Sequence, residues 1–255
     1  MLLLLTGTIN PSVFNNTNVK LISAQERLSQ YVDSIKKYIS LNMFSGIVFA
    51  ENSGYDFPTE EIKKLANEHN SQFELVRVNT DVQKTIRFGK SYGEADCIEQ
   101  GLLNSMLAKS EEYFVKCTGR VFISNLDTMC KKHRNANRFV IREDTGWCYS
   151  VVFQMNIAEY LDKFGCVKEL CDESNGVDIE TAMYNVITKK NVKFRAFRTY
   201  PYIEGVCGTT GENYTREYGF LNFLVKIGFF DINFLSKYIY KKFIGVAYKL
   251  IHLRK

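Results

Sequence analysis

The N-terminal half of the chain alternates short apolar runs with longer segments of helical periodicity, and this order strongly limits the possible folds. Four apolar runs have the length of buried strands: 2–5, 46–50, 73–78 and 113–123. Three segments between them repeat apolar residues at helical spacing: 24–39, 59–67 and 95–107. The alternation predicts an α/β, Rossmann-type fold with a mostly parallel sheet flanked by helices.

The second half is less regular but continues the same mixture. Strands are expected at 139–141, 147–154 and 192–196, and short helices at 156–163 and 178–187. With 255 residues, 45% of them hydrophobic, and only three prolines, the chain is long enough and apolar enough to bury a full core. The seven cysteines include no C-x-x-C pair, and no basic segment precedes the apolar start, so we expect reduced thiols in the cytoplasm.

The positive charge is concentrated at the C-terminal end. The net charge is +5, and residues 220–255 carry seven Lys or Arg against one Asp, which leaves −1 for the other 219 residues. Apolar residues recur there at helical steps, and lysines interrupt every run before it could span a bilayer. We therefore divide the chain into a domain at 1–215 and a tail at 216–255. The tail is predicted to form amphipathic helices on an anionic membrane surface. The alternative is a terminal helix packed on the domain.

Polar residues follow the first two predicted strands and surround the fourth. Parallel strands gather their ligands beyond their carboxyl ends, where Thr6, Gly7, Thr8, Asn52 and Asp56 are expected to lie. The stretch 88–125 adds four charged residues close to buried elements: Lys90, Glu94, Lys116 and Arg120. A salt bridge between Arg120 and Glu94 would explain that pair structurally. An anionic ligand is the functional interpretation.

A glycine-rich loop near the end of the domain could supply backbone N–H groups to a phosphate. Its candidate residues are Gly208, Thr209 and Thr210. The fingerprints G-x-G-x-x-G and G-x-x-x-x-G-K-[ST] are both missing from the sequence. A dinucleotide or P-loop site is therefore not indicated.

Several local sequences resemble bacterial glycosyltransferases of the GT-A type, found in capsule and lipopolysaccharide (O-antigen) assembly. They are LLLLTGTI, GKSYGEA, YFVKCTGRVFISN, VDIETAMYN and PYIEGVCGTTGENY. The likeness extends in element order over about residues 1–215. It implies a nucleotide-diphosphate sugar as donor, with UDP favoured, and the polar residues named above as its binding site.

The resemblance also implies a metal motif, which this sequence keeps only in part. The family carries Asp-x-Asp after the fourth strand to bind Mn²⁺ or Mg²⁺, and the matching place here reads Asn125-Leu126-Asp127. Asp127 with the diphosphate oxygens could hold Mg²⁺. Alternatively, Lys90, Lys116 or Arg120 could neutralise the diphosphate without a metal.

By the same resemblance, an acidic residue at the start of the 178–187 helix faces the acceptor and takes its hydroxyl proton. Glu180 is the first candidate for this base and Asp144 the second. Each has a structural alternative, because acids favour the first turn of a helix and Asp144 lies in a turn sequence.

The expected function is transfer of a sugar to a lipid-linked or growing surface glycan, at the inner face of the cell membrane. One alternative is a sugar-phosphate nucleotidyltransferase. Those enzymes usually have a glycine-rich basic loop after the first strand, whereas Thr6–Asn10 has one glycine and no Lys or Arg. Another is a non-enzymatic module that binds membranes or nucleic acid through the tail. Because apolar residues dominate the tail and the body is slightly acidic, no nucleic-acid partner is expected.

Overall fold

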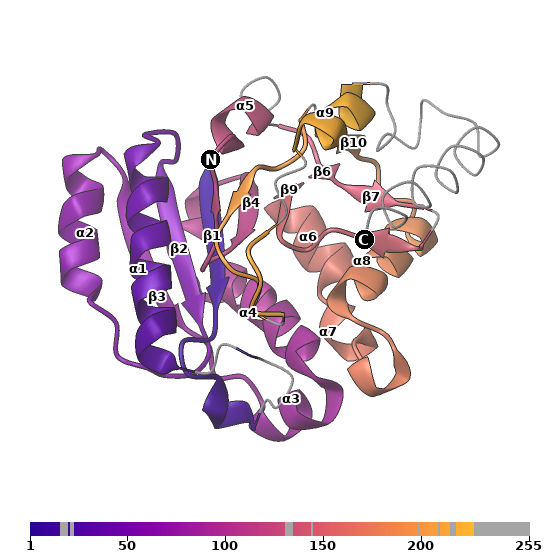
Figure 1. Ribbon diagram of the computed structural model, residues 1–255, viewed down its shortest axis with the longest axis horizontal. Coiled ribbons are helices and arrows are strands. Elements are labelled where there is room, and N and C mark those ends of the chain that lie inside the picture. Colours follow the sequence, from indigo (N-terminus) through magenta and orange to yellow (C-terminus); the bar gives the residue numbers. More distant parts are fainter. Residues whose placement is uncertain are drawn as a thin grey trace.

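The computed structural model describes residues 1–15, 20, 23–130, 135–143, 145–197, 199–208, 210–214 and 218–226 (Figure 1). Its centre is a seven-stranded sheet of order β10-β6-β9-β4-β1-β2-β3. The parallel part consists of β1 (Leu2–Gly7), β2 (Gly46–Glu51), β3 (Gln72–Arg77) and β4 (Tyr113–Thr118). β9 (Val152–Asn156) runs antiparallel to β4 and to β6 (Arg138–Phe139), and β10 (Arg195–Ala196) is parallel to β6.

Helices cover both faces of the sheet (Figure 1). α1 (Ala24–Ser40) and α2 (Thr59–Glu68) pack on one face, and α4 (Lys90–Asn104), α6 (Ile157–Phe164) and α8 (Ile179–Lys189) pack on the other. The predicted α/β fold with a mostly parallel sheet flanked by helices is confirmed.

Shorter elements connect this framework. They are η1 (Pro11–Phe14), α3 (Val82–Phe88), η2 (Ala108–Ser110), β5 (Phe122–Ile123), α5 (Leu126–Cys130), β7 (Ile141–Arg142), β8 (Trp147–Cys148), α7 (Val167–Leu170), η3 (Glu173–Asn175), β11 (Ile203–Glu204) and α9 (Tyr218–Lys226).

β1 is apolar along its length because it is buried on both faces. Successive side chains of a strand point to opposite faces, so Leu2 and Leu4 join the core cluster under α4, while Leu3 and Leu5 join the cluster under α1. α4 approaches closely at Gly101, where an added Cβ would lie 2.9 Å from the Cβ of Ala50. Small residues at this contact allow α4 to lie flat on β1 and β2.

Two predicted boundaries were wrong for long-range reasons. α4 begins at Lys90, so residues 90–94 form its first turn instead of a loop; the carboxylate of Glu173 accepts the Ser91 N–H at 2.9 Å and caps that turn. The predicted strand at 113–123 ends at Thr118. Gly119 then turns, and its N–H donates to the Thr6 carbonyl at 2.9 Å, which leaves β5 to pair with β11.

The strand predicted at 147–154 is also two strands. β8 pairs with β7 in a separate two-stranded sheet, whereas β9 belongs to the central sheet. The intervening residues 149–151 therefore leave the sheet and are available to line a site.

The described part of the tail, α9, packs against the core cluster under α1. Leu221, Leu224 and Val225 contact this cluster, and the side-chain oxygen of Asn222 accepts the Tyr200 N–H at 2.9 Å. Residues 227–255, to which most of the membrane prediction refers, lie outside the described residues. In the described part of the chain, no helix combines the length and apolar character needed to cross a bilayer. The domain boundary at 215/216 stays a prediction.

Replacing Leu4 by alanine should lower the free energy of unfolding by about 2–5 kcal/mol, because this side chain of β1 is fully buried under α4. Leu103→Ala is the matched control, since Leu103 is 46% exposed; it should cost less than about 1 kcal/mol. Urea unfolding measures both. Equal losses would contradict the assignment of this side of β1 to the core.

Candidate active site

A cavity of about 410 Å³ opens at the carboxyl ends of β1, β2 and β4. Its wall includes Thr6, Gly7 and Thr8 from the end of β1, Asn52 after β2 and Thr118 at the end of β4. The chain leaves β1 towards β2 on one side and later returns to β4 on the other side. This reversal is the place where open α/β sheets form a ligand crevice.

The loops at this edge are fixed by Glu51, a fully buried carboxylate at the end of β2. It accepts the backbone N–H groups of Ile9 at 3.1 Å, Ser53 at 2.9 Å and Gly54 at 2.9 Å. Arg77 forms an ion pair with it at 2.6 Å. One charged group thus ties the loop after β1 to the loop after β2, which sets the shape of the cavity wall.

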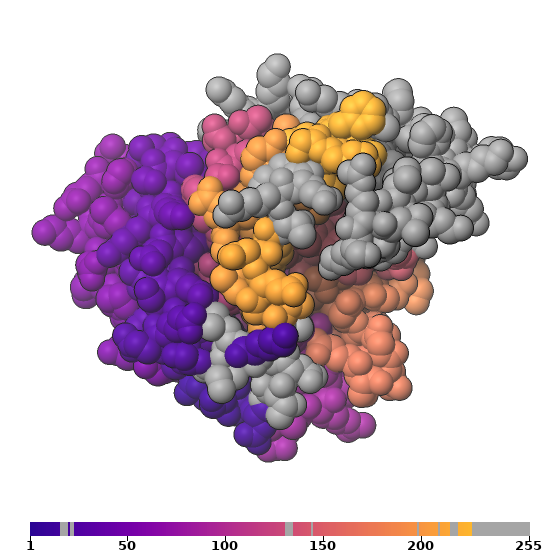
Figure 2. Space-filling view, viewed as in Figure 1, coloured from indigo at the N-terminus to yellow at the C-terminus, as the bar shows by residue number. Residues whose placement is uncertain are grey.

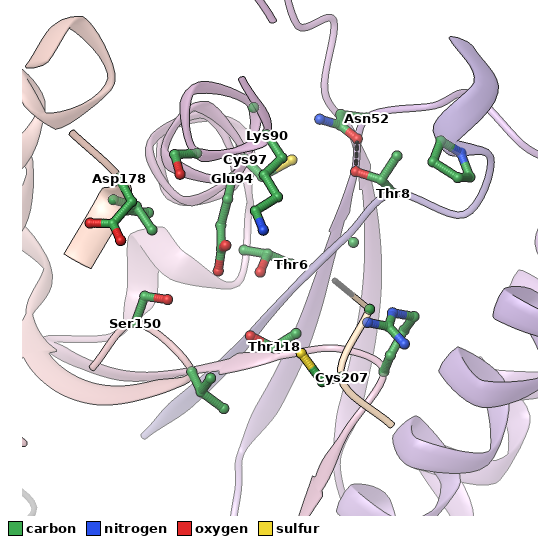
Figure 3. A pocket seen from close by; sticks show the side chains of 18 of the residues that line it. Thr6, Thr8, Asn52, Lys90, Glu94, Cys97, Thr118, Ser150, Asp178 and Cys207 are labelled. Carbon is green, nitrogen blue, oxygen red and sulfur yellow. Dashed lines mark hydrogen bonds between the residues drawn. The ribbon is translucent and has the colours of Figure 1, made fainter. Parts of the chain in front are cut away.

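Thr8 is held from three directions. Its hydroxyl donates to the Asn52 side chain at 2.7 Å, a bond drawn in Figure 3, and its N–H donates to the Tyr31 hydroxyl at 2.9 Å. Its carbonyl accepts Nε of Arg27 at 2.8 Å. Because its N–H, carbonyl and hydroxyl groups are all hydrogen-bonded, Thr8 is held in one position in the wall of the cavity.

Two buried arginines, Arg27 and Arg120, make one side of the cavity positive. Lys90 also lines the cavity, but it comes from α4, one turn before Glu94. Arg120 donates to the Gln30 side chain at 3.0 Å and to the Val206 carbonyl at 3.3 Å. Burial lowers the pKa of Arg27, and the neighbouring Arg120 adds to the lowering. An anion bound here would relieve the repulsion between the two guanidinium groups.

A strap formed by residues 199–208 and 210–214 borders this positive side. In Figure 2 it is the orange surface in the middle of the view, beside the indigo and purple N-terminal half. Val206 pairs with Asn213, and the Cys207 N–H donates to the Glu212 carbonyl at 2.8 Å, so the strap is a narrow turn. A Cβ at Gly208 would lie 2.3 Å from Nη2 of Arg120. Glycine at 208 therefore leaves room for the guanidinium group of Arg120.

The other side of the cavity carries carboxylates. Glu94 comes from α4, and Asp178 and Glu180 come from the start of α8 (Figure 3 labels Glu94 and Asp178). The Ser150 hydroxyl donates to Glu180 at 2.6 Å. Burial, followed by the nearby charge of Glu94, raises the pKa of Glu180 to about 7. A carboxyl group that titrates near neutral pH can take up and release a proton during a reaction.

Beneath these acids lies Lys116, a fully buried lysine in β4. It forms an ion pair with Glu94 and donates to the Ser150 carbonyl at 2.7 Å. The salt bridge considered between Arg120 and Glu94 does not form, because Lys116 occupies Glu94 and Arg120 turns to Gln30.

The structure brings most of the predicted site residues together. Those that line the cavity are Thr6, Gly7, Thr8, Asn52, Lys90, Glu94, Arg120, Glu180 and Gly208. Lys116 contacts the cavity residue Glu94 from below. Three predicted residues are not part of the lining: Asp56, Asp127 and Thr210. Asp144 and Thr209 lie outside the described residues.

Among the residues that the structure describes, those around the cavity do not fit a divalent metal ion. Asp127 is exposed on α5, where its carboxylate accepts the Thr128 hydroxyl at 3.3 Å. Of the cavity acids, Glu94 is paired with Lys116, Glu180 accepts the Ser150 hydroxyl, and Asp178 accepts the Thr181 N–H at 2.8 Å. Over the described ranges, no group of three or more His, Cys, Asp or Glu residues is arranged to hold a metal.

Sequence reasoning missed several residues of the lining: Arg27, Tyr31, Tyr149, Ser150, Asp178 and Tyr214. Arg27 left a signal, because it lies four residues before Tyr31 on the buried stripe of α1, where a charge is unexpected. Ser150 left none, since its place depends on the separation of β8 from β9.

No family model matches the sequence, and no curated protein matches it. The structure resembles a nucleoside-diphosphate-sugar pyrophosphorylase from Vibrio cholerae RC9, at 12% identity and a TM-score of 0.47, over 77% of this chain and 90% of that one. It also resembles a protein assigned as a nucleotide-diphospho-sugar transferase from Desulfovibrio desulfuricans G20 (7% identity, TM-score 0.45, 77% and 78% covered).

A third similar structure is assigned as a glucose-1-phosphate thymidylyltransferase from Bacillus anthracis (12% identity, TM-score 0.39, 92% and 96% covered). These proteins include both nucleotide-sugar transferases and sugar nucleotidyltransferases, so the resemblance does not separate the two reactions. Similarity at this level does not identify the reaction that this chain catalyses.

Glu180 should make the stability of the protein depend on pH. Its pKa is about 7 in the folded chain against a reference value of 4.5. Between pH 4.5 and pH 7, Glu180 is therefore protonated in the folded state and ionised in the unfolded state. The stability that this carboxyl group contributes is fully present below pH 4.5 and is lost as the pH rises through 7. Relative to Glu180→Gln, wild-type stability should fall by about 3 kcal/mol across this window. Urea unfolding at several pH values measures the difference; a constant difference would contradict the raised pKa.

Proposed function

We propose that the protein is a glycosyltransferase, which moves a sugar from a nucleoside-diphosphate donor to a hydroxyl group of a saccharide acceptor. The observation that carries this proposal is the division of one cavity into two sides. Arg27 from α1 and Arg120 after β4 line it on one side, and Glu180, whose pKa is about 7, lines it on the other side with Glu94 and Lys90 from α4. A transfer reaction of this kind needs both a site for a diphosphate and a base.

The positive side suits the diphosphate of the donor. A nucleoside diphosphate carries its charge on two adjacent phosphate groups, and a guanidinium group binds such oxygens through parallel N–H donors. Arg27 and Arg120 are both buried, so their attraction to an anion is weakly screened. Lys90, which lines the same cavity from α4, adds a third positive charge for the leaving diphosphate.

Glu180 suits the role of base towards the acceptor. As the acceptor oxygen bonds to the anomeric carbon, its proton passes to the Glu180 carboxylate, and the bond from that carbon to the diphosphate breaks. The electron pair of the broken bond stays on the diphosphate, next to the arginines. The Ser150 hydroxyl, 2.6 Å from Glu180, orients the carboxylate for this step.

The acceptor is proposed to be a lipid-linked or growing surface glycan, with the tail 216–255 on the inner membrane face. Support comes from the charge of +6 in residues 220–255 and from the exposed Phe220 and Phe223 on α9. The role in capsule or lipopolysaccharide assembly rests on the sequence resemblance.

Nucleotide binding tests the donor side. Among UDP, GDP, CDP and CMP, at least one diphosphate should bind with and without EDTA, measured by calorimetry, and UDP is favoured. Arg120→Met should weaken binding roughly 10- to 100-fold, because a charged hydrogen bond to phosphate is lost. Failure of UDP, GDP and CDP to bind would contradict the proposal, and binding of CMP alone would not support it.

A glycine pair provides a control for the position of Arg120. Gly208→Ala pushes against Nη2 of Arg120, whereas a Cβ at Gly219 meets nothing within 4 Å. Gly208→Ala should weaken diphosphate binding severalfold without lowering the melting temperature, because the displaced atom is the flexible end of a side chain. Gly219→Ala should leave binding unchanged.

Turnover tests the acceptor side. Glu180→Gln should reduce transfer at least about 100-fold while donor affinity stays within twofold, because only proton uptake is lost. Product analysis separates the reactions: glycosyl transfer releases a nucleoside diphosphate, whereas a nucleotidyltransferase consumes a nucleoside triphosphate and releases pyrophosphate. Normal turnover by Glu180→Gln would remove this residue from the mechanism.

A further inference from the structure

The buried Lys116 contacts the acidic side of the cavity from below and takes no direct part in the proposed reaction. Its ammonium group has three acceptors: the Glu94 carboxylate, the Ser150 carbonyl at 2.7 Å and the Thr118 hydroxyl at 3.3 Å. An ammonium group has three hydrogens, so these acceptors use its full capacity. A lysine with no exposed surface and three acceptors has one fixed position.

Two of these acceptors belong to the residues that act on Glu180. The Ser150 hydroxyl donates to Glu180 at 2.6 Å, which favours the ionised carboxylate. Glu94 acts in the opposite direction, because a second negative charge nearby favours the protonated form. Lys116 therefore holds in place both the residue that favours ionisation and the residue that opposes it.

Four other groups interact with Glu180, and among them Asp178 also raises its pKa, although less than Glu94 does. They are Asp178 at the start of its own helix, Cys148 in β8, Cys171 before η3 and Tyr214 in the strap. The two thiols and the phenol have pKa values raised mainly by burial, so they are neutral at pH 7. Two cations line the same cavity: Lys90, on α4 with Glu94, and Arg120. Glu94, paired with Lys116, is thus the charged neighbour that acts on Glu180 most strongly.

We propose that Lys116 is a positioning residue for the base: it fixes Glu94 and it fixes Ser150, whose hydroxyl contacts Glu180, and it thereby sets the pH above which Glu180 can accept the proton of the acceptor. This inference rests on the proposed function. The proton that leaves the acceptor hydroxyl neutralises Glu180 beside Glu94, so the repulsion between the two carboxylates falls as the reaction proceeds. The repulsion between Glu94 and Glu180 therefore favours proton uptake by Glu180 in the transition state.

The proposal predicts opposite shifts from two conservative changes. Glu94→Gln removes the negative charge while its amide oxygen can still accept from Lys116, so the pKa of Glu180 should fall by roughly one unit. Ser150→Ala removes the hydroxyl donor, so the pKa of Glu180 should rise. A titration of carboxyl carbons by ¹³C NMR measures both, with the Glu180 signal assigned by its loss in Glu180→Gln. Two unchanged values, or two shifts in the same direction, would overturn the proposal.

Lys116 itself is tested by Lys116→Gln. Loss of its charge and a looser Ser150 both favour the protonated form, so the pKa of Glu180 should rise. Lys163→Gln breaks the Lys163–Glu159 pair at 2.8 Å elsewhere in the fold and should leave Glu180 unchanged. An unchanged Glu180 titration in a folded Lys116→Gln protein would overturn the role of Lys116. If that variant does not fold, Glu94→Gln and Ser150→Ala decide the proposal.

Activity separates this inference from the proposed function. The pH profile of kcat/KM should rise with the pKa that NMR gives for Glu180 in each variant. NMR shifts without a matching change in the profile would leave the coupling intact and exclude Glu180 as the base. A missing NMR shift in a protein that binds donor and turns over would exclude the coupling and leave the function intact.

Discussion

The cavity depends on one buried carboxylate, that of Glu51. A charge without exposed surface is costly unless it is paired and hydrogen-bonded, and Glu51 meets this condition through three backbone N–H groups and Arg77. The N–H donors come from loops that follow different strands. The hydrogen bonds to Glu51 therefore determine how the loop after β1 and the loop after β2 face each other. This arrangement brings Thr8 and Asn52 together in the wall of the cavity.

The direction of β9 explains how the second half of the chain reaches this edge. A parallel strand next to β4 would begin at the far end of the sheet. β9 is antiparallel and begins where β4 ends, with Val152 opposite Cys117. Residues 149–151 therefore arrive at the carboxyl edge, where Ser150 meets Glu180 and Lys116. One antiparallel strand thus joins the acidic side of the cavity to a sheet whose parallel strands supply the other wall.

The sequence predicted the parts of the structure that are local. β1 and β2 are mostly apolar runs and α1 and α2 have clear helical spacing, because each of them is buried in a simple way. The start of α4 could not be predicted, since its cap comes from Glu173, 82 residues further along the chain. The end of β4 likewise depends on the contact of Gly119 with the Thr6 carbonyl. The first contact leaves no mark in the neighbouring sequence, and the second is marked only by Gly119 itself, where a Cβ would lie 2.9 Å from the Thr6 carbonyl oxygen.

The candidate site shows the same division between local and distant information. Lys90, Glu94 and Arg120 were recognisable as charges beside buried elements, and Glu180 as an acid at a helix start. Their pairing was not, because Lys116 rather than Arg120 occupies Glu94, and Gln30 and Val206 hold Arg120. This separation has a chemical consequence. A direct Arg120–Glu94 pair would hold this guanidinium group beside the carboxylates. Because the buried Lys116 pairs with Glu94 instead, Arg120 donates to Gln30 and Val206 and stays beside Arg27, so the arginines and the carboxylates remain separate groups in one cavity.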